Sequence, residues 1–459
     1  MTDEEFPPFE VDESVVDPHW KDDRSERPMA WLKVVDLSSG AAGPFCAKLL
    51  ADYGADVVKV EDTRRPDWAR TYRYAPDRIV DPEQGALFLY GNTNKRGLAL
   101  DLGTHEGRQV LLDVLADADI LVEDWTHQEV LDAGLDFAAL HALNPRLIVT
   151  SVTPFGRTGP FRDYKAHPLN VFHASGQGYL APMNSPDKTR EPVKGGGLVW
   201  EHDAGMASAI ATLAALYWRE NGGTGQHVDV SKQHAVMHLE KSQLRRYIDD
   251  GESPDRTGMG RLLETLVQGK DGNYVVVILS SQIQWVGLFE AMGKPEWGAN
   301  PPFDTQAGRS ANYLELRRRL QEWADGFTAE EIFHKIQACR SAAAPVYLAE
   351  HFMASDQVAA RAFLVELDHP IVGRLRYPGR SGRFSEMSWT GTRGAPVLGQ
   401  DTHEILAELG YSETEIADFE LAGAVRRNRT SDELGEHDAA VVELERAGAA
   451  RGQENSHAD

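Results

Sequence analysis

The chain has 459 residues, more than one hydrophobic core normally serves, so we expect two lobes. Its 47 basic and 71 acidic residues give a formal net charge of −24, which argues against a nucleic-acid partner because phosphate backbones bind basic surfaces. The N-terminal segment lacks the basic and apolar parts of a signal peptide, and no run of about 18 apolar residues would cross a membrane. We therefore expect a cytoplasmic protein without a membrane or nucleic-acid partner.

Strands and helices alternate along the first third of the chain. Residues 1–27 are acidic and Pro-rich and are interpreted as an N-terminal arm. Alternation of this kind predicts an α/β fold with a parallel sheet covered on both faces. The predicted elements are strands at 32–37, 56–60, 98–102, 119–122 and 147–152 and helices at 43–53 and 105–116.

The turn after the first strand is the first candidate site. Residues 34–61 read VVDLSSGAAGPFCAKLLADYGADVVKVE and lack the G-x-G-x-x-G pattern of dinucleotide-binding proteins, so the pattern favours a phosphate-bearing ligand other than NAD. Ligands of parallel sheets bind beyond the carboxyl ends of the strands, here at 38–43 and after Val60 and Val122. Cys46 is expected to be a packed thiol, and its distance in sequence from Cys339 argues against a disulfide framework.

A second segment of interest opens a long Ala-rich helix predicted at 204–218. Residues 194–205 read KGGGLVWEHDAG, so Glu201 and Asp203 stand at the mouth of that helix behind three glycines that allow a ligand to approach the backbone. The alternative interpretation makes Asp203 the N-cap and Glu201 a partner of the helix dipole.

The rest of the chain predicts a smaller lobe, after which the chain returns to strands and turns. Residues 226–345 contain strands at 226–230 and 274–280 and helices at 232–248, 284–292, 313–324 and 329–338. Residues 346–427 contain a strand at 375–378 and a helix at 402–409, and residues 428–459 form a charged tail.

Six segments, taken in order from residue 32 to residue 412, resemble the family III CoA-transferases, or CaiB/BaiF family. This group includes formyl-CoA, carnitine and bile-acid CoA-transferases and the α-methylacyl-CoA racemases. The segments are VVDLSSGAAGPFCAKLLADYGADVVKVE, NTNKRGLALDLGTHEGRQVLL, NPRLIVTSVTPFGRTGPFRDY, AALYWRENGGTGQHVDVS, FLVELDHPIVGRLRYPG and APVLGQDTHEILAELGYS.

The resemblance implies a fold and a reaction. It implies a large Rossmann-like CoA-binding domain at 28–225 to which 346–427 return, a smaller α+β domain at 226–345, and an interlocked homodimer. The reaction would be transfer of CoA from an acyl-CoA to a carboxylic acid through a covalent carboxylate anhydride and an enzyme–CoA thioester. Coenzyme A enters as a thioester substrate, and neither a tightly bound cofactor nor a metal is expected.

The resemblance also implies site residues. The family's nucleophilic Asp stands four residues before the glycine that opens the Ala-rich helix, and here that position, four before Gly205, is Glu201. Asp203 is the alternative nucleophile, although its spacing differs. The turn Ser39, Gly40, Ala41 and Ala42 would shape the nucleotide pocket, Arg70, Lys95 and Arg96 would supply positive charge, and Leu100, Asp124 and Trp125 would line the adenine or pantetheine path.

Departures from the family pattern leave two rivals open. Asp62 and Asp132 stand where transferases often place a cation, and Pro168 replaces a common Asp. A racemase or epimerase would use His167 with Glu201 to move the proton α to the thioester, since the pKa of imidazole lies near neutrality; His167 as an ordinary loop histidine is the alternative. A non-catalytic subunit in a heteromer with an active paralogue is the other rival.

Overall fold

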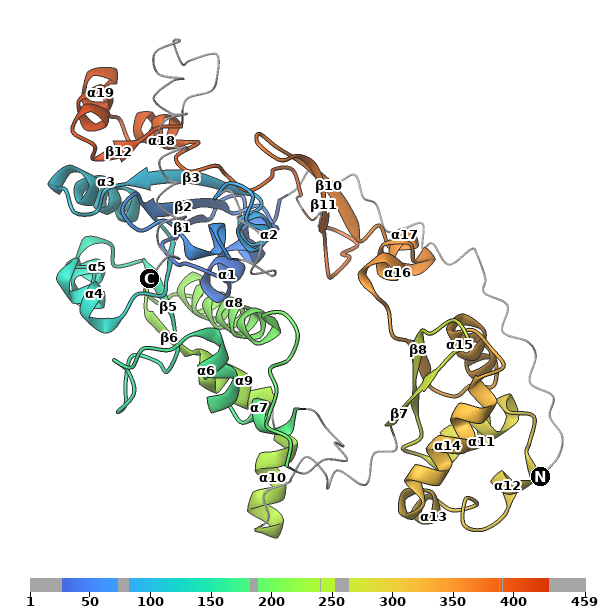
Figure 1. The fold of residues 1–459 in the computed structure, drawn as a ribbon. Helices are drawn as coiled ribbons and strands as arrows, with labels where there is room; N and C mark the ends of the chain where they lie inside the picture. Colours follow the sequence, from blue (N-terminus) through green and yellow to red (C-terminus); the bar gives the residue numbers. More distant parts are fainter. Residues whose placement is uncertain are drawn as a thin grey trace, which may run out of the picture. The chain divides into compact units, whose positions relative to one another are not determined.

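The computed structural model describes residues 27–72, 82–181, 189–239, 241–251, 264–387, 389 and 391–428, and Figure 1 shows the elements in chain order. Apart from Arg27 and Asn428, the predicted N-terminal arm and charged tail lie outside the described residues. The chain divides into two compact units. The larger comprises 21–177, 194–239 and 364–459, and the smaller comprises 1–20, 178–193 and 240–363.

A seven-stranded sheet forms the centre of the large unit (Figure 1). The strand order is β12-β3-β2-β1-β4-β5-β6. Every neighbouring pair is parallel except β12 with β3 at the edge, so the predicted α/β class is confirmed. The strands are β1 (Lys33–Asp36), β2 (Asp56–Asp62), β3 (Lys95–Leu100), β4 (Ile120–Glu123), β5 (Ile148–Thr153), β6 (His227–Ser231) and β12 (Val425–Arg426).

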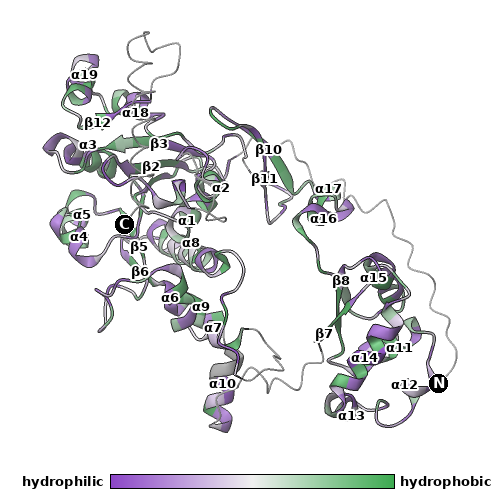
Figure 2. Cartoon of the chain, in the orientation of Figure 1, coloured by the Kyte–Doolittle hydropathy of each residue, from purple (hydrophilic) through white to green (hydrophobic). Residues whose placement is uncertain are grey.

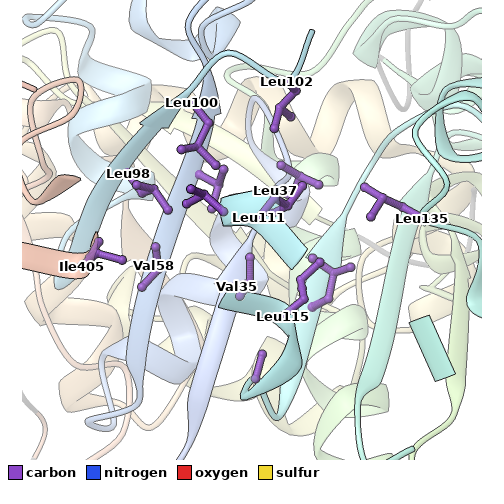
Figure 3. Close-up of a cluster of buried hydrophobic side chains, with 14 of the residues drawn as sticks. Val35, Leu37, Val58, Leu98, Leu100, Leu102, Leu111, Leu115, Leu135 and Ile405 are labelled. Carbon is purple, nitrogen blue, oxygen red and sulfur yellow. The ribbon is translucent and has the colours of Figure 1, made fainter. Parts of the chain in front are cut away.

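Both faces of this sheet are covered by helices. Successive side chains of each strand point to opposite faces, so each strand buries apolar residues on both. Val34 joins the cluster beneath α1 (Ala42–Ala51) and α8 (Val199–Glu220), whereas Val35 joins the cluster of Figure 3. The second cluster packs against α3 (His105–Ala116), α5 (Phe137–Leu143), α18 (Thr402–Glu408) and α19 (Glu413–Leu421). The continuous apolar runs of the strands are thereby explained.

The second turn of α8 packs closely against the first turn of α1 at Gly205. A β-carbon added there would lie 2.6 Å from the carbonyl oxygen of Ala42 and 3.2 Å from Phe45. A side chain at position 205 would therefore force α8 away from α1 and move the start of α8, where Glu201 lies.

We expect Gly205→Ala to lower the free energy of unfolding by about 1–2 kcal/mol, because overpacking against backbone costs more than the roughly 1 kcal/mol gained in helix propensity. Urea denaturation measures the change. The control is Gly196→Ala, since nothing lies within 4 Å of a β-carbon there. Equal stability of the two variants would contradict the packing argument.

The small unit has its own three-stranded sheet, β7 (Glu264–Gln268), β8 (Tyr274–Ile278) and β9 (Ala343–Pro345), paired antiparallel. Its core combines side chains of β7 and β8 with those of three helices, α11 (Gln282–Ala291), α14 (Tyr313–Ala324) and α15 (Ala329–Ala338). Figure 2 shows apolar strands beside helices that carry both apolar and polar residues. The shorter helices of this unit are α10 (Lys241–Asp250), α12 (Glu296–Ala299), α13 (Gln306–Ala311), α16 (Ala349–Met353) and α17 (Asp356–Ala360).

The unit boundaries differ from those expected at 226 and 345. β6 pairs with β5 and so belongs to the large sheet, and the helix predicted at 232–248 is divided into α9 (Lys232–Leu239) and α10, which fall in different units. The chain returns to the large unit at Leu364, where β10 (Leu364–His369) and β11 (Gly373–Pro378) form a hairpin. In the described part of the chain no helix is both long and apolar enough to cross a bilayer.

Candidate active site

The candidate site lies at the carboxyl edge of the large sheet. β1 has β2 on one side and β4 on the other, so the order of the strands reverses there, and such switch points bind ligands in α/β proteins. The Ser39 backbone N–H donates to Oδ2 of Asp124 at 3.0 Å, and Nε1 of Trp125 donates to the carbonyl of Leu37 at 3.2 Å. The structure thus brings together the predicted residues that follow β1 and β4.

The side chain of Asp67 binds the turn between β1 and α1. This carboxylate accepts hydrogen bonds from the Gly40 N–H at 2.7 Å and from Oγ of Ser39 at 3.0 Å. Gly40 has a φ of 83°, and a β-carbon there would overlap the Trp68 indole. Only glycine therefore suits this position, and the turn passes directly into α1, with Ala41 and Ala42 buried.

Glu201 lies in the first turn of α8, on its buried side, with only 1 % of its surface exposed. Its Oε2 accepts a hydrogen bond from Nζ of Lys232 at 2.8 Å. Lys232 is the first residue of α9 and directly follows β6, so it too stands at the carboxyl edge of the sheet. Burial alone would lower the pKa of Lys232, but the carboxylates of Glu201 and Asp124 outweigh burial and raise that pKa above its usual value.

Asp124 is the third member of this cluster. Burial raises the pKa of its carboxyl group to about 7, although Lys232 and the Ser39 N–H both favour the ionised form. Asp124 therefore changes charge near neutral pH, beside a lysine that is already paired with Glu201.

A raised carboxyl pKa makes stability fall with pH, because between about pH 4 and pH 7 the folded protein holds a proton that the unfolded chain has lost. We expect Asp124→Asn, which mimics the neutral acid and keeps an acceptor for Ser39, to be more stable than the parent by about 2 kcal/mol at pH 8, a value reduced because Asp124 is partly exposed. Urea denaturation at pH 4, 5.5 and 8 checks this. The difference should vanish near pH 4, and parallel pH profiles would contradict it.

His167 stands at the N-cap of α6 (Pro168–Ala174), where its side chain is exposed. Nε1 of Trp200 donates to the carbonyl of Pro168 at 2.9 Å, so the start of α6 lies beside the first turn of α8. Among the described residues, however, no hydrogen bond or ion pair joins His167 to Glu201. His167 therefore begins a helix that lies beside the first turn of α8, but it is not bonded to Glu201.

Asp203 lies inside α8 rather than at its start. The helix begins at Val199 after Leu198, which provides no side-chain cap, so the N-cap interpretation of Asp203 is wrong. The side chain is half-buried, and burial raises its pKa. The helix thus begins two residues before Glu201 and four residues before Asp203.

Lys95, one of the predicted cations, is fully buried below the turn. Its Nζ donates to Asp36 at 2.7 Å, to Asn92 at 2.8 Å and to the carbonyl of Pro44 at 2.8 Å. Since an ammonium group has three donors, Lys95 has none left for a phosphate.

The other two predicted cations are also paired. Arg70 is buried and forms two hydrogen bonds to Glu61, at 2.9 and 2.7 Å, as well as an ion pair with Glu83 at 2.6 Å. Arg96 binds Asp56 through two nitrogens, at 2.9 and 2.7 Å, and Glu408 at 2.8 Å. Contact of these groups with a nucleotide stays a prediction, and their observed partners are all protein carboxylates or carbonyls.

Leu100 and Trp125 differ in their accessibility. Leu100 is fully buried in the hydrophobic cluster of Figure 3, so its side chain is not open to a ligand. Trp125 lines a pocket of about 170 Å³. Sequence reasoning missed the other polar members of this pocket, His105, Arg108 and Gln109, which all lie on α3 and are exposed.

Two further expectations concern thiols and metals. Cys46 is a buried free thiol, as predicted, and burial raises its pKa to about 12. In the part of the chain that the structure describes, no group of three or more His, Cys, Asp or Glu side chains could hold a metal ion.

Comparison with known proteins identifies the family of the chain. The sequence profile of CoA-transferase family III matches residues 29–402. Succinyl-CoA–D-citramalate CoA-transferase of Chloroflexus aurantiacus is 30 % identical over 86 % of this chain and 97 % of its own, and the β subunit of succinyl-CoA–L-malate CoA-transferase from the same organism is 29 % identical over 85 % and 96 %. A CaiB/BaiF family protein from Brucella suis has a similar structure, with a TM-score of 0.73, 28 % identity and coverage of 83 % of this chain and 99 % of that one. The chain therefore belongs to CoA-transferase family III.

Proposed function

We propose that this protein transfers coenzyme A from an acyl-CoA to a carboxylic acid, with Glu201 as the nucleophile. The observation that carries the proposal is the placement of Glu201. It is a carboxylate in the first turn of a long helix, paired with Lys232 at 2.8 Å, at the sheet edge where α/β proteins bind their ligands. The positive end of the helix and the ammonium group both place positive charge beside this carboxylate.

The transfer proceeds in successive steps at the carboxylate of Glu201. An oxygen of Glu201 attacks the thioester carbonyl, the C–S bond breaks, and CoA thiolate leaves a mixed anhydride behind. The thiolate then attacks the carbonyl carbon of Glu201 and releases the donor's carboxylate, which gives an enzyme–CoA thioester. The acceptor carboxylate repeats these steps in reverse and restores Glu201. Covalent catalysis is needed because a free carboxylate is a poor electrophile.

CoA would lie along the turn Ser39–Ala42 and past Asp124 and Trp125. The N-terminal end of α1 offers backbone N–H groups and a positive dipole to a phosphate. The pocket beside Trp125 combines an aromatic wall with Arg108, which forms no ion pair with any of the described carboxylates. It is therefore the better candidate for the nucleotide end than the paired cations Arg70 and Lys95.

The relatives suggest which substrates to test first. Two of them carry succinyl-CoA in their names, and one is a β subunit. We therefore propose a short dicarboxylic acyl-CoA as donor, and a homodimer, or a heteromer with a related subunit, as the assembly.

The proposal is tested by trapping. The full-length protein is incubated with succinyl-CoA, acetyl-CoA and other thioesters, and hydroxylamine is added to convert activated Glu201 to its hydroxamate for mass spectrometry. Modification at Glu201 supports the mechanism, and modification at Asp203 would move the nucleophile. No modification with any thioester, alone or after co-expression with a related subunit that has Asp at this position, would overturn it.

A racemase would give a different result in the same samples. Solvent deuterium would enter the α-carbon of a 2-methylacyl-CoA without any carboxylate acceptor, with His167 and Glu201 as the proton carriers. We expect no such exchange, since the ring of His167 is exposed and is not bonded to Glu201.

A further inference from the structure

Lys232 is a partly buried cation of the site that was not among the predicted site residues. Three segments far apart in sequence meet around it: the end of β6, the first turn of α8 and the residue after β4. Its side chain is 13 % exposed, whereas that of Glu201 is 1 % exposed, so the open side of the pair is the lysine side. A molecule approaching from solvent would reach the ammonium group more easily than the carboxylate.

The proposed chemistry changes the charge on one partner of this pair. When Glu201 is acylated, its negative charge passes to the leaving CoA thiolate and then to the released carboxylate. Lys232 would then be a largely buried cation without a counter-ion, which is an unfavourable state in protein interiors. Something negative must replace Glu201 for the intermediates to be stable.

The charged groups that face Lys232 are Glu201 from α8 and Asp124 from the segment after β4. Asp124 already accepts the Ser39 N–H, and burial raises its pKa to about 7 although Lys232 favours its ionised form, so Asp124 carries only part of a negative charge around neutral pH. A full counter-charge for Lys232 therefore calls for an anion from outside the protein.

We infer that Lys232 binds the carboxylate group of the exchanged acid while Glu201 is held as its CoA thioester. This inference rests on the proposed function and deepens it: the same ammonium group pairs with Glu201 in the resting enzyme, with the departing acid after anhydride cleavage, and with the incoming acid before attack. At the anhydride stage the leaving CoA thiolate carries the negative charge, and at the thioester stage the free acid carries it beside Lys232. The acid substrate is thereby required to be ionised.

The test is isotope exchange between succinyl-CoA and ¹³C-labelled succinate, catalysed by the parent, Lys232→Met and Lys232→Arg. We expect Lys232→Met to raise the KM for succinate at least tenfold while the KM for succinyl-CoA changes less than twofold. Lys232→Arg keeps the charge and should stay within about threefold of the parent for both. A merely structural role would change kcat or stability without separating the two KM values.

A second measurement uses Lys232→Ala with added ethylammonium chloride, and sodium chloride at the same ionic strength as control. Ethylammonium should lower the KM for succinate in this variant and not in the parent. An unchanged KM for succinate in both Lys232→Met and Lys232→Ala, with Glu201 still trapped as its hydroxamate, would overturn the inference and leave the proposed function standing. Absence of the hydroxamate in the parent would instead remove the proposed function.

Discussion

Glu201→Gln should lower the rate of CoA transfer by at least about a thousandfold, because an amide cannot attack a thioester and no anhydride can form. The substitution keeps the size of the side chain and an oxygen that can accept from Lys232, so the fold of α8 should survive. Steady-state transfer measures the loss, and hydroxylamine trapping should give no modification at position 201. Thermal unfolding monitored by circular dichroism separates lost chemistry from lost structure.

Two matched variants on the same helix sharpen this result. Asp203→Asn should retain most activity, since Asp203 lies on a different part of the helix surface and is not bonded to Lys232 in the described structure. Glu201→Asp should retain the nucleophile but move it by about an ångström, with a loss of about a hundredfold. If Asp203→Asn abolishes transfer and Glu201→Gln does not, the nucleophile has been assigned to the wrong carboxylate.

Much of the fold could be predicted because hydrophobic runs and helical periodicity are local signals. The run at Val34–Asp36 and the helix that follows are found within two residues of the predicted limits. The boundary at 226 failed for a physical reason: the strand after Gly225 carries no mark of which sheet it joins. Its pairing with β5 depends on contacts with residues far away in sequence.

That error also hid Lys232 from the predicted site. The rule that ligands lie beyond the carboxyl ends of strands would have singled out the residue after β6, had this strand been placed in the large sheet. Glu201 was predicted from the resemblance in the motif around Gly205, and Asp124 was predicted because it follows a strand that was assigned correctly; the roles of both stay predictions. The sequence gives no local signal for the ion pair between Glu201 and Lys232.

The predicted phosphate-binding cations show a second limit of prediction from sequence: a basic residue near a strand end can already be paired inside the protein. Lys95 and Arg70 are basic residues near strand ends, but the acids Asp36 and Glu61 lie in buried strands and need partners. A buried carboxylate without a counter-ion is costly, so acids inside apolar strands are themselves a signal that nearby cations are already paired.

The second large predicted effect is a loss of stability, and it concerns the buried ion pairs around Asp36. Asp36 is fully buried; its Oδ2 lies 2.7 Å from Nζ of Lys95 and 3.9 Å from Nζ of Lys59, and its Oδ1 accepts from Ser38. Burial alone would raise the pKa of Asp36, but the two lysines outweigh it and hold the pKa below its usual value. We expect Asp36→Asn to lower the free energy of unfolding at pH 7 by about 3–5 kcal/mol, because a buried ammonium group loses its counter-ion.

Urea denaturation measures this loss, and the control is Glu408→Gln, which removes one partner of the more exposed Arg96 pair and should cost less than about 1 kcal/mol. The double variant Asp36→Asn with Lys95→Met should recover part of the stability, since it removes the unpaired charge as well. If the double variant is no more stable than the single one, the cost lies in packing or hydrogen bonding and not in the uncompensated charge.

The pH dependence of the same variant provides an independent check. Burial lowers the pKa of Lys95 to about 8 even with Asp36 present, so the unfolded chain binds more protons than the folded protein between pH 8 and the ordinary lysine pKa of 10.5. Stability linked to Lys95 therefore rises with pH in that window. Without Asp36 the pKa falls further and the window opens at lower pH, so the deficit of Asp36→Asn should be smaller at pH 9.5 than at pH 7. A deficit independent of pH would mean that Lys95 keeps its proton, and that Asn92 and the carbonyl of Pro44 suffice to stabilise it.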